Sequence, residues 1–266
     1  MERKTIEGKD LSEIFLEKIR ETNDEFLIGD MEKTLRIPCK SILFNIDQKV
    51  DATIHETSNQ IVEVFLKVFN ELCGYCSTLP FFAEFERDMD SEGVLNQLKQ
   101  TFHKQTGKSW DDERIRFHTI RSEEFAATYT AVRGGDLERA KNLLTEYRKT
   151  HNLSIESFAE KIKAYVQAQP EGFRLNFYVD EVGQFIANNT QRMLNLQTVV
   201  ETLNTVCGGQ AWIFVTSQAS LEAVVGRDPG QDFSRIQDRF RVKVNLDGKD
   251  VSEVIQLRLL KKKREY

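Results

Sequence analysis

The last third of the sequence alternates strand-like and helix-like segments, and this alternation constrains the fold more than any other feature. Short apolar runs typical of buried strands occur at residues 175–181, 211–218 and 242–246. Helix-periodic segments separate them, at residues 191–206 and around residues 232–240. Parallel neighbours need a crossover connection, which is usually a helix, so this order favours a parallel sheet with helices packed on it. We therefore predict an α/β fold.

Upstream of this region, one further strand-like run precedes a long helical block. The run SILFNID at residues 41–47 is compact and apolar, as in a buried parallel strand. An amphipathic helix is predicted over residues 11–35, before Pro38. From about residue 57 to residue 168, apolar residues recur at spacings of three and four, which indicates helices. The helices predicted there cover residues 59–72, 91–105, 111–120, 137–150 and 154–169.

Composition argues against functions that depend on nucleic-acid steering, a membrane span or a metal site, and it does not identify a partner. A net charge of −5 over 266 residues provides no field that would steer the chain onto nucleic acid. The charged N-terminal stretch MERKTIEGKD and the lack of a long apolar run favour a cytoplasmic protein with no membrane partner. The Cys73–Cys76 pair stands alone and is interpreted as core packing, and the four histidines lack the spacing of metal ligands.

The hexapeptide QTGKSW at residues 105–110 ends like a phosphate-binding loop but lacks the context of one. Such a loop needs a preceding strand and a glycine five residues before the Gly-Lys pair. That position is Phe102, and the preceding residues are helix-periodic. We predict instead that Gly107 ends one helix and that Ser109 or Asp111 begins the next.

Two carboxylates, Asp180 and Glu181, end the strand predicted at residues 175–181. Open α/β sheets bind their ligands at the carboxyl ends of strands. In a nucleotide hydrolase the first carboxylate at such a place holds Mg²⁺, and the second orients the attacking water. The alternative is that both carboxylates only cap the following helix, which the positive helix N-terminus favours. These residues alone leave both interpretations open.

Polar residues also end the next strand, at Thr216, Ser217 and Gln218. If the two strands are neighbours, these side chains lie beside the acidic pair. Neutral hydrogen-bonding groups there can contact a terminal phosphate and position water. They can equally cap a following helix.

The segment DFSRIQDRFRVKV, which leads into the last predicted strand, provides two candidate catalytic arginines. In ring-forming ATPases an arginine at this place reaches the γ-phosphate held by the neighbouring subunit. Arg239 is the first candidate and Arg235, one helical turn earlier, is the second. A surface ion pair with Asp232 or Asp238 is the alternative.

Five sequence blocks together resemble the N-terminal ATPase region of the BrxC family, large P-loop proteins of bacterial BREX phage-defence systems. The blocks are ILFNIDQK, VEVFLKVFNELCGY, FYVDEVGQFI, MLNLQTVVETLNTVCGGQAWIFVTSQ and DFSRIQDRF. The resemblance implies a partial P-loop NTPase (AAA+-like) parallel sheet with a large, mainly helical insertion. It also implies that YVDE is the Walker B segment, TSQ the sensor-1 region and RF an arginine-finger segment.

The resemblance also implies an organisation, cofactors and partners. The expected parts are an N-terminal helix and first core strand at 1–56, a helical insertion at 57–170 and the ATPase core at 171–266. ATP and Mg²⁺ are the expected cofactors, bound in the complete protein. Self-association or other BREX proteins are the expected partners, with DNA reached through the assembly.

One departure from the family concerns the Walker A loop, which in the family precedes the LFNID strand. Nothing in this sequence replaces it, so the chain is expected to be a fragment that begins after the loop, and to be inactive alone. We expect the strands LFNID, FYVD and IFVTS to stay paired without the strand that carries this loop. The alternative is a non-catalytic protein-interaction module built on a degenerate ATPase core, with the helical block as its working surface.

Overall fold

The computed structural model describes residues 5–6, 8–50, 59–186, 189–217, 240, 242 and 244. The chain divides into two units, Met1–Arg227 and Asp228–Tyr266, and the helices and strands of the described residues all belong to the first. The strands are β1 (Thr5–Ile6), β2 (Lys9–Asp10), β3 (Cys39–Asn45), β4 (Arg174–Asp180) and β5 (Ala211–Val215). The α-helices are α1 (Leu11–Arg20), α2 (Glu25–Thr34), α3 (Ile46–Lys49), α4 (Gln60–Cys73), α5 (Pro80–Ser91), α6 (Leu95–Thr106), α7 (Trp110–Glu113), α8 (Ser122–Arg133), α9 (Leu137–Thr150), α10 (Ile155–Gln167), α11 (Val182–Ile186) and α12 (Thr190–Val206), and a 3₁₀ turn η1 covers Arg114–Arg116.

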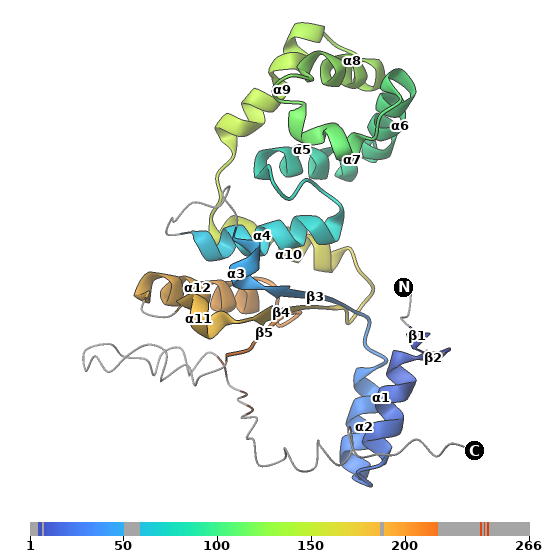
Figure 1. Cartoon of the computed structure of the whole chain (residues 1–266), viewed down its shortest axis with the longest axis vertical. Helices are drawn as coiled ribbons and strands as arrows, with labels where there is room; N and C mark the ends of the chain where they lie inside the picture. The colour runs from blue at the N-terminus through green and yellow to red at the C-terminus, as the bar shows by residue number, and fades with distance from the viewer. Residues whose placement is uncertain are drawn as a thin grey trace, which may run out of the picture. The chain divides into compact units, whose positions relative to one another are not determined.

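The central sheet consists of three parallel strands in the order β3–β4–β5 (Figure 1). Strand β4 lies in the middle and pairs along its length with β3 and β5, so the predicted pairing of LFNID, FYVD and IFVTS is confirmed. The α/β class with a parallel sheet is confirmed with it. Because the strands are parallel, their carboxyl ends meet at one edge of the sheet.

One face of this sheet packs against helices of the predicted insertion. The Phe65 ring, on α4, lies 5.5 Å from that of Phe44 on β3 and 5.3 Å from that of Phe177 on β4, centre to centre. Phe158, on α10, lies 6.2 Å from Phe65, and all four rings are buried. The first and last helices of the block at 57–170 therefore build the core of the sheet, and the helices between them extend away from it (Figure 1).

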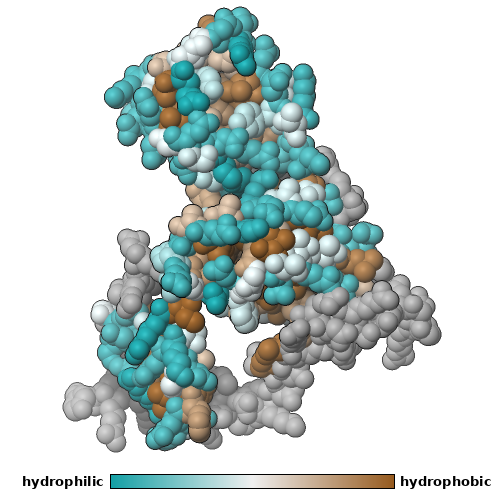
Figure 2. All heavy atoms as spheres, turned by 180° about the vertical axis from the view of Figure 1, so that it is seen from behind, coloured by the Kyte–Doolittle hydropathy of each residue, from teal (hydrophilic) through white to brown (hydrophobic). Residues whose placement is uncertain are grey.

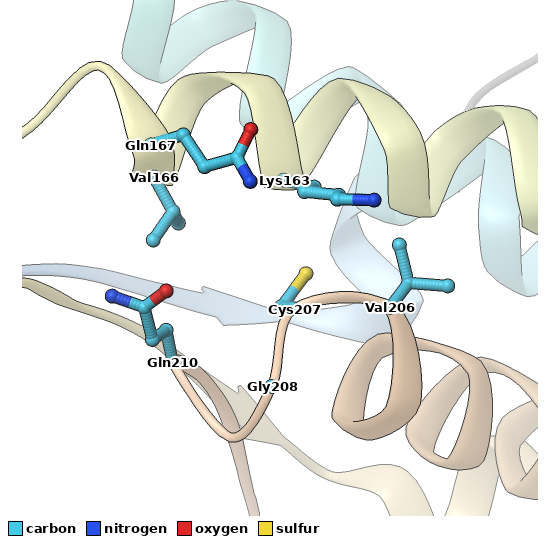
Figure 3. A pocket seen from close by; sticks show the side chains of 7 residues that line it. All are labelled: Lys163, Val166, Gln167, Val206, Cys207, Gly208 and Gln210. Carbon is cyan, nitrogen blue, oxygen red and sulfur yellow. The ribbon is translucent and has the colours of Figure 1, made fainter.

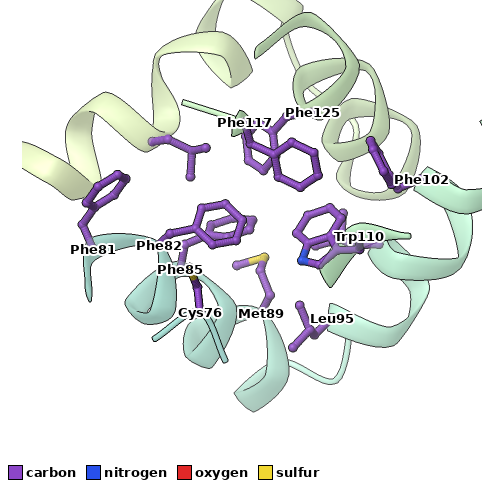
Figure 4. Packing of buried hydrophobic residues seen from close by; sticks show 12 residues of the cluster. Cys76, Phe81, Phe82, Phe85, Met89, Leu95, Phe102, Trp110, Phe117 and Phe125 are labelled. Carbon is purple, nitrogen blue, oxygen red and sulfur yellow. The ribbon is translucent and has the colours of Figure 1, made fainter. Parts of the chain in front are cut away.

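Helices α5 to α9 surround an aromatic cluster of their own (Figure 4). Its buried residues are Cys76, Phe81, Phe82, Phe85, Met89, Leu95, Leu98, Phe102, Trp110, Phe117, Phe125 and Leu144. All of them lie between residues 76 and 144, so this part of the chain, called the helical module below, has a hydrophobic core separate from that of the sheet.

The predicted helix at 111–120 is wrong, and the aromatic cluster explains why. The chain forms the short helix α7 and the turn η1 instead, followed by turns up to residue 121. The rings of Trp110 and Phe117 lie 4.7 Å apart, centre to centre, inside the cluster. In a continuous helix, seven residues separate two Cα atoms by about 10 Å. The break between α7 and the following turns brings the two rings into direct contact inside the cluster.

A buried carboxylate ties three parts of the helical module together. Glu86, on α5, is fully buried. It accepts hydrogen bonds from the Cys76 backbone N–H at 2.6 Å, from Trp110 Nε1 at 2.9 Å and from Arg114 Nη1 at 3.1 Å. Because a buried charge is costly unless it is paired and hydrogen-bonded, these donors determine whether the module is stable.

The predicted helix at 11–35 is two helices, α1 and α2, joined by a tight turn. Asn23 adopts a left-handed backbone conformation with φ of 56°, which ends the first helix. Asp24 then caps the second, since its side chain accepts a hydrogen bond from the Leu27 backbone N–H at 3.0 Å. The amphipathic pattern continues through the turn, so periodicity alone does not reveal the break.

The surface of the described helices is mostly hydrophilic on the face drawn in Figure 2. Among the described residues, no helix combines the length and the apolar composition needed to cross a membrane.

Candidate functional site at the carboxyl edge of the sheet

The carboxyl edge of the sheet brings together the polar residues that end β4 and β5. Asp180 is the last residue of β4, and Thr216 follows the last residue of β5. The register pairs Val179 with Val215, so Asp180 and Thr216 occupy the next position on adjacent strands. The expectation that these strand ends are neighbours is confirmed.

A network of hydrogen bonds fixes this juxtaposition. Thr216 Oγ1 donates to Asp180 Oδ1. The backbone N–H of Thr216 donates to the Val179 carbonyl at 3.0 Å, and that of Val182 donates to the Thr216 carbonyl at 3.1 Å. The backbone N–H of Glu181 lies 3.4 Å from Thr216 Oγ1. Main-chain and side-chain bonds therefore hold the end of β5 against the turn that follows β4.

Glu181 occupies an unusual backbone conformation in this turn. Its φ of 62° lies in the left-handed region, which non-glycine residues rarely adopt. Its carbonyl accepts a hydrogen bond from the Phe185 N–H at 3.3 Å, so Glu181 also begins the short helix α11. Backbone strain of this kind costs about 1–3 kcal/mol and clusters at functional sites. The strained residue thus lies directly after β4, next to Asp180.

The predicted site residues are only partly within the described structure. Ser217 directly follows Thr216, at the same edge of the sheet. Gln218, Arg235 and Arg239 lie outside the described residues, so their predicted roles stay predictions.

Asn45 is a residue of this edge that sequence reasoning did not single out. It ends β3 and pairs in register with Asp180. Its Oδ1 accepts a hydrogen bond from the Gln48 N–H at 3.1 Å and thereby caps the short helix α3. The polar residue after the apolar run SILF was the signal that could have identified it. The ends of three neighbouring strands and the residues directly after them thus provide an amide, two carboxylates and two hydroxyls at this edge.

The donor set at this edge suits a magnesium ion that a phosphate group also binds. The described residues contain no group of three or more His, Cys, Asp or Glu side chains that could hold a metal ion by themselves. Mg²⁺ prefers octahedral oxygen coordination, and it commonly takes one or two carboxylates and leaves the other positions to water and substrate phosphates. Asp180 and Glu181 provide two carboxylates of this kind. The described residues are thus chemically compatible with Mg²⁺ that is bound together with a phosphate group, and among them no all-protein cage is formed.

The GKS sequence lies in the helical module and forms no phosphate loop. Helix α6 precedes it, and Gly107 ends that helix with φ of 72° and a backbone N–H that donates to the His103 carbonyl at 2.8 Å. Ser109 begins α7 with an extended backbone, although its side chain makes no capping bond. The prediction of a helix end at Gly107 and a helix start at Ser109 is confirmed.

A shallow hollow of about 180 Å³ lies at the opposite edge of the sheet (Figure 3). It is lined by Lys163, Val166, Gln167, Val206, Cys207, Gly208 and Gln210. The last three residues directly precede β5, so the hollow lies at the amino ends of the strands. Ligands of open α/β sheets bind at the carboxyl ends. Burial raises the pKa of the Cys207 thiol to about 11, so this thiol is not a reactive nucleophile near neutral pH.

The predicted packing role of the Cys73–Cys76 pair agrees with the structure. Both thiols are free, and Cys76 is buried in the aromatic cluster. Burial raises the pKa of the Cys73 thiol to about 11.

No family model matches the chain, and no solved structure matches it at a significant level.

Proposed function

We propose that this chain is part of an ATP-hydrolysing P-loop protein of a BREX-type phage-defence system, in which it contributes the Walker B and sensor residues. The observation that carries the proposal is the contact between Thr216 and Asp180 at the carboxyl ends of adjacent parallel strands. A helix cap does not require this contact, because a carboxylate that caps its own helix bonds to backbone N–H groups and not to the next strand. The resemblance to the BrxC family supports the same interpretation.

Each residue at the edge has a role that its chemistry allows. Asp180 would hold Mg²⁺, and Glu181 would accept a hydrogen bond from the attacking water and orient it. Thr216, Ser217 and Gln218 contact the terminal phosphate with neutral hydrogen-bonding groups. Thr216 also positions the Asp180 carboxylate. When bound, Mg²⁺ neutralises charge that develops on the phosphate oxygens.

Two further roles depend on residues beyond this edge. Arg239, or Arg235 in its place, reaches a nucleotide held by a neighbouring copy and stabilises charge in the transition state. In other P-loop proteins, a glycine-rich loop binds the β- and γ-phosphates through its backbone amides and a lysine. The described residues of this chain contain no loop of that kind. In this proposal another segment of the ATP-hydrolysing protein provides the loop, and this chain alone binds ATP poorly.

A second candidate function is a protein-interaction module, and the separate core of the helical module favours it. A part of the chain with its own aromatic core keeps its surface in place without help from the sheet. In this alternative the strand-end residues serve only to stabilise the turn after β4. The two candidates predict different consequences for a substitution that preserves the shape of the edge and removes a charge.

Asp180→Asn in the complete protein provides the test. The amide keeps an oxygen that accepts from Thr216 and loses the negative charge that Mg²⁺ needs. We expect the Mg²⁺ concentration for half-maximal ATP hydrolysis to rise about tenfold or more. Asp112→Asn is the matched control, because Asp112 is exposed on α7 and far from the sheet edge in the sequence. An unchanged Mg²⁺ dependence in Asp180→Asn, or a complete protein without ATPase activity, contradicts the proposal.

A further inference from the structure

The face of the sheet opposite α4 and α10 carries large apolar side chains that remain exposed. We call it the aromatic sheet face and define it by Leu43, Tyr178, Trp212 and Phe214, whose exposed fractions are 78%, 38%, 51% and 41%. Leu43, Tyr178 and Phe214 occupy one row across the three strands, since Leu43 pairs with Tyr178 and Tyr178 pairs with Phe214. The rings of Tyr178 and Phe214 stack with centres 4.6 Å apart. A contiguous apolar surface of this kind is typical of a site that packs against another element.

Parallel sheets are normally covered on both faces, because their crossover helices pack on both sides. Here α4 and α10 pack on one face, as Figure 1 shows. Helix α12, which connects β4 to β5, contacts α10, α4 and β5 and so lies on the same side. Among the described helices, those that pack closely on the three strands therefore leave the aromatic sheet face without a second layer.

The N-terminal helices α1 and α2 form a hairpin that also exposes its apolar side chains. Each helix has ten residues, and none of these residues is buried. Leu11 and Phe15, one helical turn apart on α1, are 47% and 46% exposed, and Phe26 on α2 is 89% exposed. Leu35 and Ile37, directly after α2, are 38% and 40% exposed. Helices of this length are only marginally stable without tertiary packing, so the hairpin needs a partner surface.

The link between α2 and β3 keeps the hairpin from reaching the aromatic sheet face of its own copy. The backbone N–H groups of Leu35, Arg36 and Ile37 donate to carbonyls of α2, at 3.0, 3.1 and 3.1 Å. The φ angle of the next residue, Pro38, is fixed by its ring, and its carbonyl accepts a hydrogen bond from the Arg174 N–H at 2.9 Å. Folding the hairpin onto its own sheet would therefore break bonds at both ends of the link. A second copy offers the same face without this cost.

We propose that the α1–α2 hairpin of one copy of this chain covers the aromatic sheet face of a second copy, and that the exchange is reciprocal. A two-fold pair brings the same two surfaces together twice and leaves neither of them uncovered. Exchange of an identical element between copies is a low-cost way to form such a pair.

The dimensions of the two surfaces match. Each ten-residue helix is about 15 Å long, and two helices packed about 9 Å apart cover a width of about 20 Å. Three strands at a spacing of about 4.8 Å span a width of about 15 Å. One hairpin is therefore wide enough to cover all three strands of the sheet.

The apolar area is also sufficient for a stable dimer. At about 200 Å² for a large side chain, the exposed fractions given above amount to about 900 Å² for one hairpin and one aromatic sheet face together. A reciprocal pair makes this contact twice and so buries up to about 1,800 Å². Stable protein–protein interfaces bury about 1,200–2,000 Å².

This inference does not depend on the proposed function. ATP hydrolysis concerns the carboxyl edge of the sheet, and association of two copies can be measured without nucleotide. Failure of one proposal therefore leaves the other untouched.

Sedimentation equilibrium of the 266-residue chain tests the inference. We expect reversible dimers. Phe15→Asp on the hairpin and Leu43→Asp on the aromatic sheet face should each raise the dissociation constant of the dimer about 100-fold or more, because each buries a charge in both contacts. Ile120→Asp is the matched control, because it makes the same change at an apolar side chain of the helical module that is 82% exposed. It should leave the dissociation constant unchanged.

An equimolar mixture of Phe15→Asp and Leu43→Asp gives the sharpest result. In a mixed pair, the intact hairpin of Leu43→Asp meets the intact aromatic sheet face of Phe15→Asp, so one of the two contacts is restored. We expect mixed dimers at protein concentrations at which each variant alone is monomeric. Circular dichroism should show that the variants stay folded, and Leu11→Asp with Trp212→Asp is a second pair for which we expect the same results.

Three results would overturn the inference. The first is a chain that stays monomeric at every protein concentration, which would leave both surfaces without the proposed partner. The second is a dimer that Phe15→Asp leaves intact, as expected if two aromatic sheet faces meet each other. The third is a mixture of folded variants that forms no mixed dimer.

Discussion

Removal of the Glu86 carboxylate should strongly destabilise the helical module. Glu86→Ala removes the acceptor of the Cys76 N–H and of Trp110 Nε1. It also leaves Arg114 Nη1 with only the Gly74 carbonyl and the more exposed Asp111 carboxylate as partners. The side chain of Arg114 is only 17% exposed, so water compensates little for the lost charge partner. Breaking a buried ion pair on one side costs about 3–5 kcal/mol, and each unsatisfied buried donor costs about 1–3 kcal/mol. We therefore expect the free energy of unfolding to fall by about 3–5 kcal/mol.

Urea unfolding, followed by far-ultraviolet circular dichroism, measures this change. Glu92→Ala is the control, because it removes a carboxylate next to the end of the same helix that pairs with Arg133 at the surface. A surface ion pair contributes about 0–1 kcal/mol, so the control should stay within that range. If Glu86→Ala loses less than about 1 kcal/mol, the buried carboxylate does not organise the module and this reasoning is refuted.

Three further predictions concern the stability of the chain and its use of nucleotide. Burial by itself raises the pKa of the Glu84 carboxyl, but a hydrogen bond from His151 and the charge of Lys161 outweigh it and hold the pKa below its usual value of 4.5. These interactions therefore stabilise the folded state above pH 4.5, and the stabilisation is lost as the pH falls through the lowered pKa of Glu84 in the folded protein. The melting temperature of Glu84→Gln should accordingly fall less between about pH 6 and pH 3 than that of the unaltered chain. Calorimetry of the isolated chain should detect no ATP binding at micromolar nucleotide, whereas tight binding would show that the chain holds its own phosphate site. Lys108→Ala should leave ATP hydrolysis by the complete protein unchanged, because the GKS sequence is a helix boundary. A loss of ATP hydrolysis in this variant would mean that the GKS sequence does bind phosphate.

Much of the sheet could be predicted because its strands are short and mainly apolar. Runs such as SILF and LNFYV leave little alternative to a buried strand, and their order along the chain favours parallel pairing. The helices α5 and α8 were not predicted individually. The aromatic residues of α5 face a core that other helices complete, and that core forms only when the chain is folded. Local periodicity therefore predicts that the block is helical, but it does not predict helices α5 and α8 or how the helices pack.

Sequence reasoning identified Asp180, Glu181, Thr216 and Ser217 at this edge, but it did not identify Asn45 or the geometry that brings these residues together. The position of Asp180 and Thr216 at strand ends follows from the apolar runs that precede them. The left-handed backbone at Glu181 and the bond between Thr216 and Asp180 depend on how β5 meets the turn after β4. A sequence pattern cannot predict this contact, because the contact arises from the pairing of β4 and β5, which helix α12 separates in the chain.

The ATPase activity of the complete protein with Glu181→Gln tests the central claim most directly. The amide keeps the size of the side chain and removes the group that orients the attacking water. Glu171→Gln, in the exposed turn before β4, is the matched control. We predict that turnover falls by about 10²-fold or more in Glu181→Gln while nucleotide affinity is retained, and that the control is unaffected. Turnover equal to that of the unaltered protein would contradict the claim that this edge of the sheet activates water for ATP hydrolysis.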